Sequence, residues 1–307
     1  MALASQCLPA AEKVEAASIS QWAVRTADWL LDRLAAHSGP WRLHVFCVAA
    51  AESSVTPARC RYVQQAVANI LAKKQRRLRR SCNETYAGPL ASDEWLLQVG
   101  MRTATEGYLS ALPPLSWPGW RRCVSRFPGG RVDVPADRRA PSRAFAKLAE
   151  VELRLARQLM ASESCVDLGS SPGSWAYWAL KRGATVVAVD RSPLRTDLMR
   201  EPRLTFIRGD AFRYRPTETV DWLLCDVIAF PAKTIARVER WLSEGWCRWF
   251  CVTIKFRGQA DYDQLEPLKA GLSSAGHDFY LRRLTANKNE VMLFGRTSAD
   301  GRTAGGL

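Results

Sequence analysis

Four acidic side chains each follow a short apolar run in the second half of the chain. They are Asp167, Asp190, Asp210 and Asp226. The carboxyl ends of parallel strands in an open α/β sheet meet at one crevice, so we expect these carboxylates to gather there. A single aspartate after a strand often only caps the following helix. Four of them in such regular places indicate a binding site.

A turn rich in glycine and serine follows the first of these runs, within the segment Cys165–Trp175. The segment predicts a strand, a turn and a helix beginning near Trp175, an arrangement that forms nucleotide pockets in α/β sheets. The Gly-x-Gly-x-x-Gly fingerprint of dinucleotide sites is absent. The turn, together with the single acid that ends the run Thr185–Asp190, therefore favours S-adenosylmethionine. The alternative is an ordinary βαβ unit that binds no ligand.

The acids at the strand ends suit different parts of that cofactor. Asp190 could take the two ribose hydroxyls, Asp210 suits the adenine amino group, and Asp226 would lie beside the reacting carbon. Lys255 follows another apolar run, and we expect it to point into the same crevice rather than into solvent. A lysine at a strand end on the surface is the alternative for Lys255.

The elements that must position these residues alternate between strand and helix. A helix is predicted over residues 141–159. The predicted strands are 164–167, 185–190, 204–207, 221–225, 249–254, 278–284 and 290–295. Helices separate the early strands, which predicts a doubly wound sheet. The short gap Thr285–Asn289 predicts a hairpin at the sheet edge, so we expect an α/β fold with a mixed, mostly parallel, Rossmann-like sheet.

The first part of the chain predicts a separate and smaller α/β domain. Helices are expected over 19–37 and 57–80 and strands over 41–49 and 94–99, and Thr103–Ser110 continues the domain. A run rich in proline, tryptophan and glycine follows. The predicted division is an N-terminal domain 1–120, a linker 121–140, a catalytic domain 141–297 and a flexible tail 298–307.

The formal net charge of +14 is unusual for an otherwise ordinary globular composition. Both halves carry more basic than acidic residues, so a single basic tail does not explain the excess. A polyanion such as RNA is the expected partner, and a basic surface that aids solubility is the alternative. The densest basic run predicts phosphate contact about as strongly as it predicts a solvated helix face. Its residues are Lys73, Lys74, Arg76, Arg77, Arg79 and Arg80.

Other classes of protein are disfavoured by what the sequence lacks. The nine cysteines form no Cys-x-x-Cys pair, so we expect no metal and interpret them as thiols of a reducing cytoplasm. Met1–Lys13 shows no basic and apolar leader, and no apolar run approaches the ~18 residues of a membrane span. We expect a cytoplasmic monomer without a membrane partner.

Four of the positions together resemble the Lys-Asp-Lys-Glu tetrad of the Rossmann-fold ribose 2′-O-methyltransferases of the FtsJ/RrmJ type. They are Lys147, Asp226, Lys255 and Glu290. Alone, Lys147 and Glu290 would be ordinary positions on a helix and a strand. The resemblance runs from about Phe127 to Arg296. It is closest to the RlmM group, which methylates a cytidine of large-subunit (23S) rRNA.

Three segments carry that closer resemblance. They are Pro-Ser-Arg-x-x-x-Lys147, Cys-Asp-x-x-x-x-Pro-Ala-Lys233 and Trp-Leu-x-x-Gly-Trp-Cys247. The resemblance implies that Lys255 is the general base, which requires a neutral amine. It implies that Asp226 orients Lys255, and that Glu290 holds Lys147 and the ribose.

The resemblance also implies a cofactor site and an RNA-binding region. The implied cofactor residues are Ser142, Asp167, Gly169, Ser171, Pro172, Gly173, Ser174, Trp175, Asp190, Asp210 and Asp226. Ser174 stands where the family has a second glycine, and we expect it to offer its backbone N–H and cap the helix. Residues 1–120 are shorter than the family's N-terminal region, which predicts a degenerate THUMP-like module.

Two other functions remain open on the same fold. A base-directed or small-molecule methyltransferase is disfavoured, because base amino-methylation usually wants an Asn/Asp-Pro-Pro-aromatic strand end and this chain has Asp226-Val-Ile-Ala. A catalytically inactive RNA-binding or ribosome assembly factor is disfavoured by the intact tetrad. The target nucleotide, and the choice between naked rRNA and a precursor particle as substrate, stay open.

Overall fold

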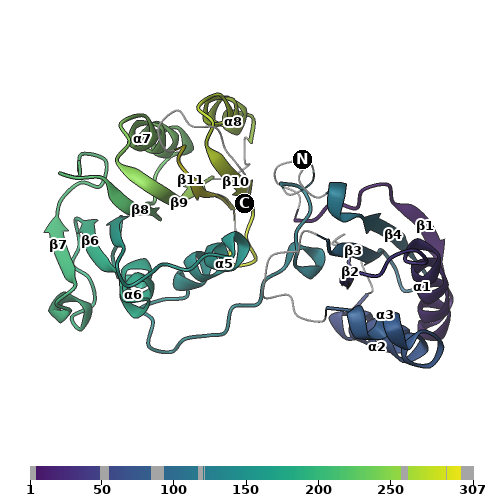
Figure 1. Ribbon diagram of the computed structural model, residues 1–307. Coiled ribbons are helices and arrows are strands. Elements are labelled where there is room, and N and C mark those ends of the chain that lie inside the picture. Colours follow the sequence, from purple (N-terminus) through teal and green to yellow (C-terminus); the bar gives the residue numbers. More distant parts are fainter. Residues whose placement is uncertain are drawn as a thin grey trace. The chain divides into compact units, whose positions relative to one another are not determined.

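The computed structural model describes residues 5–48, 55–83, 93–116, 120, 122–256, 262–287 and 289–298. It divides into two compact units, Met1–Arg131 and Val132–Leu307 (Figure 1). The division falls inside the segment 121–140 that we expect to be a linker. The predicted tail lies outside the described residues, apart from Ser298.

The first unit is a four-stranded sheet with two long helices packed against it (Figure 1). The strand order is β1-β4-β3-β2, in which β2 and β3 are parallel and the other pairs are antiparallel. The elements are β1 (Glu12–Glu15), α1 (Ile19–Arg33), β2 (Trp41–Cys47), α2 (Pro57–Lys74), α3 (Arg76–Ser81), β3 (Trp95–Met101) and β4 (Glu106–Leu112). Strand β1 escaped prediction because it is four residues long and buries only Val14.

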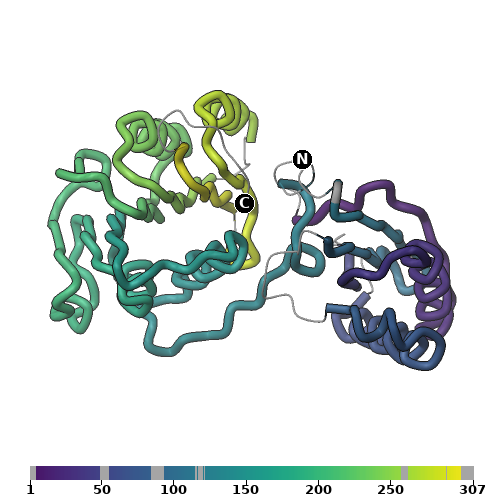
Figure 2. Tube along the Cα trace, viewed as in Figure 1, coloured from purple at the N-terminus to yellow at the C-terminus, as the bar shows by residue number. Residues whose placement is uncertain are grey.

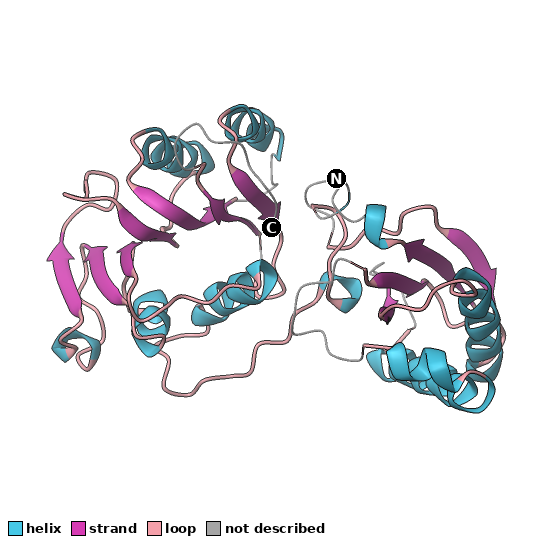
Figure 3. Ribbon diagram, in the orientation of Figure 1, coloured by secondary structure: helices cyan, strands magenta, loops and turns pink. Residues whose placement is uncertain are grey.

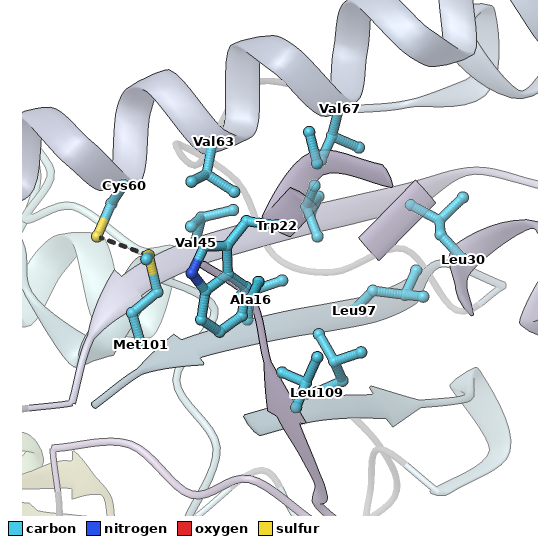
Figure 4. Close-up of a cluster of buried hydrophobic side chains, with 14 of the residues drawn as sticks. Ala16, Trp22, Leu30, Val45, Cys60, Val63, Val67, Leu97, Met101 and Leu109 are labelled. Carbon is cyan, nitrogen blue, oxygen red and sulfur yellow. Dashed lines mark hydrogen bonds between the residues drawn. The ribbon is translucent and has the colours of Figure 1, made fainter. Parts of the chain in front are cut away.

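Apolar side chains from both long helices meet the sheet in one core (Figure 4). Trp22 of α1 and Val63 of α2 are fully buried there with Leu97 of β3. The Trp22 indole N–H donates to the carbonyl of Ala104, so even this large ring leaves no polar atom unpaired. These contacts give the unit a hydrophobic core of its own.

The single helix predicted over residues 57–80 is wrong, because the structure has two helices there. Gln75 adopts φ −146° and ψ 71°, which ends α2 and begins α3. The break lets Leu78 turn inward, where it is buried and its carbonyl accepts the Trp41 indole N–H at 2.8 Å. Burial of Leu78 therefore overrides the continuous helical pattern of the sequence.

The second unit is a seven-stranded sheet in the order β10-β11-β9-β8-β5-β6-β7. Helices α5 and α6 cover one face, and α7 and α8 cover the other (Figure 3). The strands are β5 (Ser164–Leu168), β6 (Thr185–Asp190), β7 (Leu204–Arg208), β8 (Val220–Cys225), β9 (Cys247–Lys255), β10 (Asp278–Arg282) and β11 (Glu290–Arg296). The helices are α5 (Phe145–Leu155), α6 (Ser174–Lys181), α7 (Pro231–Ser243) and α8 (Leu265–Ser274). Short 3-10 turns lie at Pro114–Ser116, Pro128–Gly130, Leu198–Arg200 and Tyr262–Gln264.

The prediction of a mixed, mostly parallel sheet is confirmed. Strands β5 to β9 pair in parallel, while β11 runs antiparallel to both β9 and β10. Figure 2 traces the course of the chain through this unit, from teal to yellow. The predicted hairpin is the β10–β11 pair. Helix α5 is shorter than predicted, because the Ser142 hydroxyl accepts the Ala144 N–H before it and Ala156 turns to φ +52° after it. Within the described residues, no helix is both long and apolar enough to cross a membrane.

The turn between β5 and α6 requires glycine at two positions. Gly169 has φ +74°, and a Cβ there would lie 2.4 Å from the Val227 Cγ2 atom. Gly173 has φ +108°, and its Cβ would lie 2.4 Å from Leu198 Cδ1. Positive φ and close packing both exclude larger residues. Gly169 therefore lets the turn approach the loop after β8, and Gly173 lets it approach the 3-10 turn after β6.

We predict that Gly169→Ala destabilises the second unit by about 2–4 kcal/mol, from the left-handed backbone plus the clash with Val227. Gly271→Ala is the matched control, because Gly271 lies on exposed helix α8 with nothing within 4 Å of its Cβ. The control should raise the unfolding free energy by about 0.5–1 kcal/mol. Denaturant unfolding of both variants measures the difference, and equal effects would contradict this account of the turn.

Candidate active site

The tetrad residues come from four elements and meet beside the end of β8. Lys147 lies in the first turn of α5, and Asp226 follows β8 directly. Lys255 ends β9 and Glu290 begins β11, where the two are directly paired across the antiparallel ladder. The side chains of such a pair lie on the same face of a sheet. The structure therefore brings all four predicted residues together.

Asp226 joins the two lysines. Its carboxylate lies 3.2 Å from the Lys147 ammonium and 2.9 Å from the Lys255 ammonium. Lys255 also donates to the Asp226 carbonyl at 2.7 Å. Glu290 contacts Lys147 at 2.7 Å, so two cations and two anions balance. The four side chains are between 10% and 21% exposed, so solvent screens these contacts less than it screens surface pairs.

A cavity of about 600 Å³ opens beside this cluster, at the carboxyl ends of the parallel strands. Asp226 and Lys255 line it. Lys147 contacts Asp226, and Glu290 joins through Lys147. The cavity also reaches the turn after β5 and the ends of β6 and β7. A small molecule held along the turn would therefore present one end to Asp226 and Lys255.

The residues predicted to hold a cofactor all line this cavity, with the exception of Gly173, which begins helix α6 as its N-cap. The two carboxylate oxygens of Asp190 accept the backbone N–H groups of Ser171 and Ser192. A carboxylate has about four acceptor sites, so Asp190 keeps capacity for ligand hydroxyls. Asp210 accepts the Phe212 N–H, and this bond, more than the Arg191 ion pair, lowers the Asp210 pKa.

Asp167 is almost fully buried under the turn. Its Oδ2 atom accepts the Ser170 hydroxyl at 2.6 Å and the Ala176 N–H at 3.0 Å. Burial raises the pKa of Asp167 to about 7. The side chain therefore ties the turn to helix α6, which is a positioning role.

Ser174 does not cap α6 with its side chain, so that prediction is wrong. Gly173 is the N-cap residue, and Ser174 is the first residue of the helix. The Ser174 hydroxyl instead lies 2.7 Å from the Ser142 hydroxyl. The Trp175 indole N–H donates to the carbonyl of Ala144 at 2.9 Å. These two bonds join the turn to the start of α5, and so help to place Lys147.

Several cavity residues were missed by the sequence reasoning. They are Ala144, Ser170, Arg191, Gly209, Ala211, Phe212, Val227, Ile228, Ala229, Phe230 and Lys233. The Lys233 ammonium lies 4.1 Å from the centre of the Phe212 ring. Ile228 and Phe230 could have been predicted from their position in the sequence. They follow Asp226, the acid after β8, in a loop that is too short to bury its own apolar side chains.

The predicted RNA-contacting residues lie in the first unit, at the end of α2 and on α3. Arg79 is half-buried and the others are exposed. Arg77 donates to the carbonyl of His37 at 2.8 Å. Within the described ranges, no group of three or more His, Cys, Asp or Glu side chains could hold a metal ion.

A mixed sheet of this strand order, with its cavity at the carboxyl ends of the parallel strands, defines a Rossmann-like methyltransferase fold. The model of the FtsJ-like methyltransferase family matches residues 140–254. The chain belongs to this family, in the group of the ribosomal RNA large subunit methyltransferases M.

Three curated relatives, each called ribosomal RNA large subunit methyltransferase M, illustrate the similarity. The protein of Halorhodospira halophila is 31% identical over 233 residues, which are 73% of this chain and 67% of that protein. The protein of Laribacter hongkongensis is 35% identical, over 56% of this chain and 52% of its own length. The protein of Cronobacter sakazakii is 38% identical, over 44% of this chain and 38% of its own length. The chain spans between 52% and 57% of the length of several such relatives.

We predict that Asp167→Asn changes how stability depends on pH. Because the pKa of Asp167 is raised, the folded protein keeps the Asp167 carboxyl protonated from about pH 4 to pH 7, while the unfolded chain releases that proton. The contribution of Asp167 to stability should therefore fall as pH rises through this window, and level off above about pH 7. Asparagine removes that fall.

The measurement is the unfolding free energy of both proteins between pH 4.5 and pH 8. The unfolding free energy of the variant minus that of the wild type should increase as pH rises. The altered hydrogen bonds add a difference that does not depend on pH. Asp133→Asn, at an exposed position, controls for the loss of charge. A difference that does not vary with pH would show that Asp167 is ionised throughout.

Proposed function

We propose that this chain is an S-adenosylmethionine-dependent RNA ribose 2′-O-methyltransferase, acting on a cytidine of large-subunit (23S) rRNA. The single observation that carries the proposal is the Asp226–Lys255 pair at the cavity, held by Lys147 and Glu290. The family of the chain supports it. A cytoplasmic monomer acting on naked rRNA or on a precursor particle is consistent with this role.

The cavity residues fit the cofactor. Gly169 and Gly173 let the turn pack closely against Val227 and Leu198, which fixes the course of the turn beside the cavity. Asp190 and Asp210 offer carboxylate oxygens that suit ribose hydroxyls and an amino group. When bound, S-adenosylmethionine supplies a methyl group already activated by its sulfonium.

The remaining task of the protein is to orient the ribose hydroxyl and accept its proton. In its neutral form, Lys255 can direct two N–H groups at the carbonyl and the carboxylate of Asp226. Its lone pair then remains to accept the proton of the 2′-hydroxyl. The Lys147 ammonium also contacts the Asp226 carboxylate, which helps to fix the acid that positions Lys255. Glu290 fixes Lys147 in place.

We predict that Lys255→Ala lowers methyl transfer by at least 10²-fold, because the general base is lost. Cofactor affinity should stay within about threefold, since the turn and Asp190 are unchanged. The substrate is rRNA from cells that lack this gene, the transfer is followed with labelled S-adenosylmethionine, and the affinity is measured by calorimetry. Lys269→Ala, which removes a half-buried lysine paired with Glu266 on α8, is the control and should keep full activity.

The same pair of proteins separates the competing functions in cells. Ribose methylation is mapped across rRNA and tRNA with the gene deleted, and with wild type or Lys255→Ala restored. One ribose methyl group should disappear on deletion and return only with wild type. Unchanged ribose methylation would remove the proposal, and rescue of ribosome assembly by Lys255→Ala would favour an inactive assembly factor. Turnover of Lys255→Ala within tenfold of wild type would refute its role as base.

The basic residues of α2 and α3 are proposed to contact RNA phosphates. Neutralising Arg76 and Arg80 to glutamine should weaken RNA binding and reduce the slope of log affinity against log salt by about 0.7 to 0.9 for each phosphate that the variant no longer binds. Arg25→Gln, at an exposed position on α1, is the control. Binding to rRNA fragments is titrated between 50 and 200 mM salt. An unchanged slope in the double variant would mean that α2 and α3 are a solvated surface.

A further inference from the structure

Two large apolar side chains are exposed at the edge of the cavity, in the loop between β8 and α7. Ile228 is 76% exposed and Phe230 is 65% exposed, and both line the cavity together with Asp226 and Lys255. Ile228 is the most exposed large apolar side chain in the part of the chain that the structure describes. We call Ile228 and Phe230 the apolar ledge.

The fold holds the ledge in place from both ends. Asp226, two residues before Ile228, is fixed by its contacts to two lysines. Pro231, directly after Phe230, is buried as the first residue of α7. A proline restricts the preceding residue to extended backbone, and Phe230 has φ −65° and ψ 145°. The phenyl ring is therefore carried on a backbone that is ordered before any ligand arrives.

Exposure of both side chains is unfavourable unless a ligand covers them. Full burial of one such side chain is more favourable than leaving it exposed to water by roughly 1.5–3 kcal/mol of free energy. Helix α7 buries a different set of residues, among them Thr234, Val238 and Trp241, so the ledge is not part of its packing face. An apolar surface beside a polar reaction centre fits a ligand that is flat and apolar on its faces and polar at its edges.

We propose that the apolar ledge is the subsite for the nucleobase whose ribose is presented to Lys255, an inference that rests on the proposed function. The base is bonded to the carbon next to the one that carries the 2′-hydroxyl, so it must lie within a few ångströms of the reacting group. Ile228 and Phe230 are two and four residues from Asp226, at most about 7 and 14 Å along an extended chain. Bases turned out of single-stranded RNA commonly stack on aromatic side chains.

The surrounding charges suit a nucleotide in that place. Lys233, in the first turn of α7, lines the same cavity, and its ammonium can meet a phosphate next to the target. The acids that suit the adenosine of the cofactor follow β6 and β7. The ledge instead follows β8, which pairs with the strand that carries Lys255. The base and the cofactor therefore have separate places along the sheet edge.

The test compares Phe230→Ala, Phe230→Tyr and the control Met160→Ala, which removes an exposed apolar side chain from the loop that leads into the opposite end of β5. The probe is an rRNA fragment that contains the mapped methylation site. Phe230→Ala should raise the KM for this RNA about 5- to 150-fold, the range for loss of one base stack. Phe230→Tyr and Met160→Ala should stay within threefold of wild type. Cofactor affinity should be unchanged in every variant.

A second arm removes the base instead of the ring. The same fragment is made with an abasic ribonucleotide at the target position, which keeps the 2′-hydroxyl. Wild type should lose about as much apparent affinity for this RNA as Phe230→Ala loses for the intact RNA. Phe230→Ala should lose little more on the abasic RNA. If the two losses multiply, the ring and the base do not interact and the ledge is not a base subsite.

The remaining outcomes separate this inference from the proposed function. A wild-type protein that methylates no ribose overturns the proposed function, and the role of the ledge with it. An active wild type with an unchanged KM in Phe230→Ala overturns the ledge alone. A loss of cofactor affinity in Phe230→Ala that matches its loss of RNA affinity would also overturn it, because the ring would then serve the cofactor.

Discussion

The geometry of the site depends on one carboxylate, that of Asp226, between two ammonium groups. Without it, Lys147 and Lys255 would be two cations at close range in a partly buried place, where their repulsion is poorly screened. With it, each lysine is fixed, and Lys255 gains a second acceptor in the Asp226 carbonyl. Glu290 then brings the cluster to neutrality. The acid thus fixes where the amine of Lys255 lies at the edge of the cavity.

Lys147 reaches this cluster from a helix that precedes the sheet, and its place has to be fixed separately. The Ser142–Ser174 hydroxyl pair and the bond from the Trp175 indole to Ala144 join the start of α5 to the turn after β5. The turn is itself tied to α6 by Asp167. Lys147 and the turn after β5 are therefore parts of one hydrogen-bonded structure. A change in the turn would therefore shift the position of Lys147, even though the two are far apart in the sequence.

The sequence predicted the second unit well because its strands are apolar runs that end in acids. The predicted bounds of β6 match the observed strand, and the tetrad was predicted from the resemblance to the FtsJ-type family. Features that depend on tertiary contacts could not be predicted. The break at Gln75 follows from burial of Leu78, and the bond of Ser174 needs Ser142 from another segment. The exposure of Phe230 depends on which face α7 buries, and residue type alone does not show that.

Asp167 and Asp226 show how the environment decides the role of the same residue type on neighbouring strands. Asp167 is the penultimate residue of β5, where it pairs with Leu224, and Asp226 directly follows β8. Asp167 is buried and accepts hydrogen bonds from neutral donors, and its burial raises its pKa to about 7. Asp226 is more exposed and faces two lysines. A strand-end aspartate therefore marks the edge where the site lies, but only the neighbouring cations make it part of the chemistry.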